Sequence, residues 1–70
     1  MVKTYVTFGQ EHVHRVNNKT FDCDCVAVVD GGRDRVVELF ELRFCFTYTQ
    51  EQLDNGQLDM SYYPRGLLEV

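Results

Sequence analysis

Two histidines and two cysteines stand in matching H-x-H and C-x-C spacings, and they are the residues of this chain best suited to chemistry. They are His12, His14, Cys23 and Cys25. Residues two apart in extended chain project to the same side, so a suitable hairpin would present two imidazoles and two thiols as a tetrahedral zinc site. Common structural zinc sites use wider cysteine spacing. We therefore interpret the cysteines as small core residues and expect no metal or other cofactor, with a small metal- or ligand-binding domain as the alternative function.

Catalysis would have to use the same histidines or Cys45. Imidazoles titrate near neutral pH, and a thiol nucleophile needs a histidine and an orienting carboxylate beside it. Arg43 lies near Cys45 in the sequence and would favour its thiolate. A chain of 70 residues rarely forms a deep, water-excluding pocket, however. We predict that the protein is not an enzyme.

Acidic and aromatic side chains are the stronger candidates for a binding surface. The net charge is −4, from eleven acidic and seven basic residues. A row of carboxylates can mimic phosphates and dock on a basic surface, while tyrosine and arginine are favoured at interface hot spots. The alternatives are an ordinary solvated acidic face and a docked tail. The residues predicted to contact a partner are Asp22, Asp24, Glu38, Glu41, Tyr62, Tyr63 and Arg65.

Strand signals are clearest in three segments that would position these residues. Residues 2–8 are rich in β-branched and aromatic types, which favours a strand. Residues 21–29 begin with alternating polar positions and become apolar on both sides, as expected for a central strand. Residues 43–49 continue an alternation of aromatic side chains that begins at Phe40. Asn17-Asn18 predicts a turn, because asparagine tolerates positive φ.

The segment 30–42 has two interpretations. Asp30-Gly31-Gly32 either closes a tight hairpin or precedes a helix over about 32–41, in which Val36 and Phe40 share a face. We favour the helix. Residues 50–56 predict a polar turn or a single helical turn, and 58–63 a possible further strand before an apolar, docked end. The prediction is an α+β fold, a small antiparallel sheet in β-β-α-β-β order with one short helix packed on it.

Length and composition restrict the remaining possibilities. Seventy residues suffice for a single domain, 1–70, and the nine Phe and Tyr residues favour a folded core. The basic residues are scattered, so we expect no direct nucleic-acid binding. The longest apolar run is far shorter than a membrane span, and we expect no secretory signal and no membrane contact. An exposed strand edge makes a homodimer a further possibility.

Three segments together resemble short bacteriophage and mobile-element proteins of uncharacterised function. They are F-G-Q-x-H-x-H (8–14), V-x-E-L-F-x-x-R-F-C-F-x-Y (36–48) and Y-Y-P-R-G-L-L-E-V (62–70). In such proteins the middle segment is usually a helix running into an aromatic strand. The resemblance brings no catalytic residues. What it implies is a phage origin, and tiny acidic phage proteins are often stoichiometric inhibitors of host machinery, including anti-CRISPR proteins.

The combined expectation is a small, acidic, non-enzymatic binding protein in the cytoplasm of a bacterial host. Its partner would be a bacterial protein or ribonucleoprotein complex, in defence or in nucleic-acid handling, inhibited through protein–protein contact.

Overall fold

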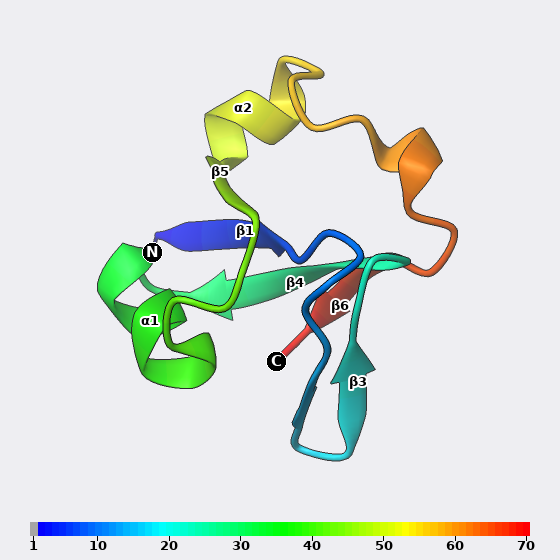
Figure 1. Cartoon of the computed structure of the whole chain (residues 1–70). Helices are drawn as coiled ribbons and strands as arrows, with labels where there is room; N and C mark the ends of the chain where they lie inside the picture. The colour runs from blue at the N-terminus through cyan, green and yellow to red at the C-terminus, as the bar shows by residue number, and fades with distance from the viewer. Residues whose placement is uncertain (1) are drawn as a thin grey trace.

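Two antiparallel strands form the centre of the protein, and the rest of the chain covers them on both faces (Figure 1). The computed structural model describes residues 2–70. Its strands are β1 (Lys3–Thr7), β2 (His14–Val16), β3 (Lys19–Phe21), β4 (Cys25–Asp30), β5 (Phe46–Thr49) and β6 (Gly66–Glu69). Its helices are α1 (Arg33–Phe40) and α2 (Gln50–Asp54), with a 3₁₀ turn over Met60–Tyr62. The main sheet has the order β5-β1-β4-β6, and β2 and β3 form a separate hairpin.

One face of the main sheet carries an aromatic core. Alternate residues of β1 and β4, such as Val6 and Val29, project onto it and are buried. Helix α1 covers this face with Val36 and Phe40, which stand four residues apart and therefore on one side of the helix. The hairpin adds Phe21. Burial of these side chains is what holds α1 and the hairpin against the sheet.

The opposite face has a second, smaller core. Tyr5, Val26 and Val28 project onto it and pack against Leu58 from the segment after α2. Side chains of α2 and the 3₁₀ turn complete this layer, namely Leu53 and Met60. Because both faces of β4 are covered, its near-continuous apolar sequence is explained as that of a central strand.

The α+β class predicted from the sequence is confirmed, and so is a helix rather than a hairpin after Gly32. The Asn17-Asn18 turn is also found, with φ of 52° and 66°. The sheet is not wholly antiparallel, because β6 pairs with β4 in parallel, Val26 standing opposite Leu67. The tail, the segment that follows the 3₁₀ turn and leads into β6, crosses from the second core back to the start of β4. Strand β6 therefore enters the sheet in the same direction as β4 (Figure 1).

Three predicted strands are corrected. The segment 21–29 is not one strand, because a turn at 22–24 separates β3 from β4. The strand predicted over 43–49 begins only at Phe46, since Phe40 belongs to α1 and the residues between them are irregular. The segment 58–63 does not pair as a strand and contains the 3₁₀ turn instead, where the Asp59 carboxylate accepts a hydrogen bond from the Ser61 amide. No helix within residues 2–70 has the length and apolar character needed to cross a membrane.

Candidate functional site

The turn between β3 and β4 holds two of the predicted partner-binding acids in a fixed geometry. Oδ1 of Asp22 accepts a hydrogen bond of 3.0 Å from the backbone N–H of Asp24. This contact is the local side-chain-to-backbone bond by which aspartate stabilises turns. It leaves Asp24 exposed and Asp22 half-buried. The turn therefore presents one carboxylate outward and uses the other partly for its own structure.

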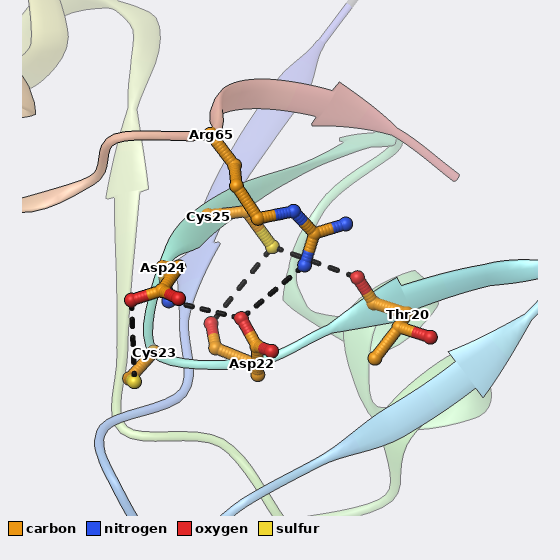
Figure 2. Close-up of polar contacts among 6 residues, drawn as sticks. All are labelled: Thr20, Asp22, Cys23, Asp24, Cys25 and Arg65. Atoms are coloured by element: carbon orange, nitrogen blue, oxygen red, sulfur yellow. Dashed lines mark hydrogen bonds and ion pairs between the residues drawn. The ribbon is translucent and has the colours of Figure 1, made fainter.

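Arg65 joins this turn to the tail that leads into β6 (Figure 2). Its guanidinium donates to Asp22 Oδ1 at 3.3 Å, and its backbone N–H donates to the carbonyl oxygen of Asp24 at 2.9 Å. The Asp22 and Arg65 side chains remain 28% and 41% exposed, so this ion pair contributes at most about 1 kcal/mol. We call Asp22, Asp24 and Arg65 the turn–tail junction. It brings together residues that are more than forty positions apart in the sequence.

The tyrosines of the tail have different roles. Tyr62 is 74% exposed, whereas Tyr63 is half-buried against the second core. Burial raises the pKa of Tyr63 above its ordinary value. Of the two, only Tyr62 offers a largely free ring, three residues before the junction.

The predicted acids of α1 form a second group. Glu38 is exposed and pairs with Arg35 on its own helix at 2.9 Å. Glu41 is exposed and follows the last residue of α1. Within residues 2–70, no hydrogen bond or ion pair links either of them to the turn–tail junction. Helix α1 follows the carboxyl end of β4, whereas the turn precedes the amino end (Figure 1). The predicted partner-binding residues thus fall into two groups.

The two cysteines of the C-x-C pair do not share a face, contrary to the sequence-based interpretation. Cys25 is completely buried, and its thiol lies 3.9 Å and 3.8 Å from the carbonyl oxygens of Thr20 and Asp22 (Figure 2). Cys23 is exposed on the turn, with its thiol 3.6 Å from Asp24 Oδ1. The turn at 22–24 reverses the alternation that a continuous strand would have kept. Cys25 is a core residue as expected, and Cys23 is not.

The two histidines are separated as well. Nε2 of His14 lies 2.6 Å from the carbonyl oxygen of Arg43, and its ring packs between Phe8 and Phe40 at centroid distances of 5.5 Å and 5.1 Å. His12 stands in the loop before β2 and lines a shallow pocket with Cys45. Among residues 2–70, no group of three or more His, Cys, Asp or Glu side chains is placed to hold a metal ion. The four-residue zinc arrangement of the alternative function is therefore not formed.

Thiol alkylation will test this placement of the cysteines. We expect iodoacetamide to modify the native protein at Cys23 and Cys45, which are exposed, and to modify Cys25 only after denaturation. Cys23 should react slowly at neutral pH, because loss of surrounding water and the nearby carboxylates of Asp24 and Asp22 raise its pKa. Peptide mapping by mass spectrometry identifies each site. Rapid native labelling of Cys25 would contradict the fold at the start of β4.

Two local signals in the sequence were missed, one in this turn and one at the start of α2. Asp22-x-Asp24 is a turn pattern that the apolar alternation around it concealed. Thr49 and Gln52 form a capping box, in which each side chain bonds the other residue's backbone N–H, at 3.1 Å and 2.8 Å. The Arg65–Asp22 contact had no local signal.

Comparison of the chain with protein-family models, with curated proteins and with solved structures finds no match in any of the three.

Proposed function

We propose that this chain is a non-enzymatic binding protein of phage type that inhibits a bacterial defence or nucleic-acid-handling complex by protein–protein contact, in the cytoplasm of the host. The contact surface is the turn–tail junction together with the ring of Tyr62. The observation that carries the proposal is the Arg65–Asp22 link, because it joins the acidic turn to the tyrosine tail. The phage origin and the class of target rest on the sequence resemblance.

The chemistry of the junction favours a basic partner surface. The Asp22 carboxylate is paired with the Arg65 guanidinium, whereas the exposed Asp24 side chain has no cation bound to it among the described residues. A partner arginine or lysine can therefore pair with Asp24 without breaking an existing ion pair. Tyrosine is also among the residue types that most often dominate binding energy at interfaces, and the Tyr62 ring is exposed. The protein's own charge of −4 would speed encounter with such a surface.

The first test is the binding of purified CRISPR effector complexes to the immobilised protein, measured by biolayer interferometry. We expect one effector to bind at near-equal stoichiometry and to lose its nuclease activity. If no effector in a broad panel binds, the proposed target class is wrong.

Charge variants then test the surface itself. Asp24→Lys should weaken the affinity tenfold or more, since like charges brought together at an interface cost several kcal/mol and about 1.4 kcal/mol is tenfold. Asp54→Lys is the matched control, with the same charge change at the exposed end of α2. Asp22→Asn keeps an acceptor for the Asp24 amide while removing the charge paired with Arg65. If the Asp24 and Asp54 variants bind with equal affinities, the turn–tail junction is not part of the interface.

The variant Glu38→Lys tests which acidic group contacts the partner, the turn–tail junction or the acids of α1. The junction surface predicts an affinity close to that of the unmodified protein, because Glu38 lies on α1 and is already paired with Arg35. A loss confined to Glu38→Lys would place the interface on α1 instead. Circular dichroism spectra of all variants will be needed to check that each retains the fold.

A further inference from the structure

Strand β6 is held to the sheet by less apolar burial than the strands beside it. No residue of β6 is fully buried, whereas every residue of β4 except Asp30 is. The apolar contribution of this segment comes from Leu68 and Val70, which are partly buried against the aromatic core, while Leu67 is 47% exposed. Because apolar burial is the main source of stability, β6 is attached more weakly than β1 or β4. Its parallel pairing with β4 is also slightly less stable per residue than antiparallel pairing.

Polar contacts tie β6 down at both of its ends. At the far end, Lys19 Nζ donates to the Glu69 carbonyl oxygen at 2.6 Å, and Lys3 pairs with the Glu69 carboxylate at 3.3 Å. At the near end stand the two contacts of Arg65 with the turn at 22–24. Exposed contacts of this kind contribute little each, and salt weakens them further. The strand is therefore closed by a few weak contacts.

The turn–tail junction depends on this closure. Gly66, the first residue of β6, directly follows Arg65 and stands opposite Cys25 of β4. Figure 2 shows the Arg65 backbone at the start of β6, with its side chain extending back to Asp22. If Gly66 left its place beside Cys25, Arg65 would be carried away from the turn at 22–24. The junction therefore exists only while β6 is docked.

The chain before β6 is anchored separately. Tyr63 packs against the second core, on the other face of the sheet. Between Tyr63 and β6 lies a turn, in which the Gly66 N–H donates to the Tyr63 carbonyl oxygen at 2.9 Å and Gly66 has φ of +72°. A change of backbone angles in this turn can move β6 without disturbing the second core. The turn is therefore placed to act as a hinge.

We propose that β6 opens and closes as one unit about the turn at 63–66, and that its docking on β4 assembles the turn–tail junction. Weakly buried segments of native proteins commonly open in such cooperative units, at a smaller free-energy cost than global unfolding. Here the unit carries both Arg65 contacts with it, so opening dismantles the junction while β1, β4 and α1 stay folded.

For partner binding, a consequence follows that rests on the proposed function. A partner that recognises the junction binds only the closed state, so its apparent dissociation constant is the intrinsic one divided by the closed fraction. By reciprocity, a bound partner holds β6 closed. The opening equilibrium itself belongs to the free chain and is measured without a partner. Its failure would leave the proposed contact surface standing, and a failure to bind CRISPR effectors would leave the opening standing.

The test is native-state amide hydrogen exchange of the full chain, followed by NMR at urea concentrations below the unfolding transition. The reporters are the Arg65 N–H, which donates to the Asp24 carbonyl oxygen at 2.9 Å, and the Val70 N–H, which donates to the Val28 carbonyl oxygen at 3.2 Å. They lie at the two ends of β6. We expect both amides to have the same protection factor, about tenfold or more below that of the amides between β1 and β4. Their exchange should depend only weakly on urea, because opening exposes little surface.

Two variants at opposite ends of β6 test whether it moves as a unit. Lys19→Met removes the contact with Glu69, and Asp22→Asn removes the charge paired with Arg65. Each should speed the exchange of both reporter amides by the same factor, about twofold to fivefold, the equivalent of one surface ion pair. Arg15→Met is the matched control, since Arg15 is exposed on the same hairpin as Lys19 and has no ion pair among the described residues. It should leave both amides unchanged.

Two results would overturn the proposal. If each variant speeds only the amide at its own end, β6 frays from its ends and does not open as a unit. If both reporter amides exchange with the steep urea dependence of the amides between β1 and β4, β6 is released only by global unfolding. Urea unfolding curves of the variants separate faster opening from a general loss of stability.

Discussion

Replacing Phe40 by alanine should unfold most of the protein at room temperature. The Phe40 ring is 1% exposed and packs against the rings of Phe8, Phe21 and His14 at centroid distances of 5.0, 5.7 and 5.1 Å. Removing such a ring costs about 3–5 kcal/mol through lost burial and the cavity left behind. A domain of this size rarely has more than about 3–5 kcal/mol of net stability. The loss is therefore comparable to the whole free energy of unfolding.

Urea titration followed by circular dichroism measures this loss directly. Phe46→Ala is the matched control, because the same side chain is removed from a site that is 62% exposed. We expect Phe46→Ala to lower the free energy of unfolding by less than about 1 kcal/mol, as surface substitutions generally do. Similar midpoints for the two variants would mean that α1 does not close the aromatic core.

Phe40 also explains where sequence-based prediction succeeded and where it failed. It belongs to two patterns at once, a helical face with Val36 and an alternation that runs on to Tyr48. The helical pattern holds up to Phe40, because the ring fills the space between Phe8 and Phe21. That space is created by residues distant in the sequence. The alternation after Phe40 therefore predicted a strand that starts too early.

The candidate site was only partly predictable for a similar reason. Asp22 and Asp24 were predicted to contact a partner, yet the local pattern placed them on a strand rather than in a turn. Their connection to Arg65 depends on β6 pairing in parallel with β4, which places Arg65 beside Asp24. Pairing between segments forty residues apart leaves no periodicity in either segment. By contrast, β1, β4 and α1 are specified by their own apolar patterns.

Gly31→Ala should destabilise the protein by about 1–3 kcal/mol, the cost of holding a residue in a strained backbone conformation, plus the cost of a steric clash. Gly31 has φ of +125°, and an added Cβ would stand 2.9 Å from Cβ of Arg35. Its N–H donates to the Val2 carbonyl oxygen at 2.8 Å, and its own carbonyl accepts from the Thr4 hydroxyl at 2.7 Å. The backbone at Gly31 therefore cannot rotate to relieve the strain without losing both bonds.

Gly32→Ala provides the comparison one residue along the chain. Gly32 has φ of −92°, and an added Cβ would meet nothing within 4 Å. Only the modest preference for glycine over alanine at the start of a helix is lost, and the stiffer unfolded chain offsets part of that. We expect Gly31→Ala to unfold at a clearly lower temperature than Gly32→Ala. Both variants add the same methyl group. The difference between their unfolding temperatures therefore measures how strongly the fold requires the backbone conformation of Gly31, where β4 leads into α1. Equal unfolding temperatures would mean that α1 can leave β4 by another route, and that the positive φ at Gly31 is not required by the fold.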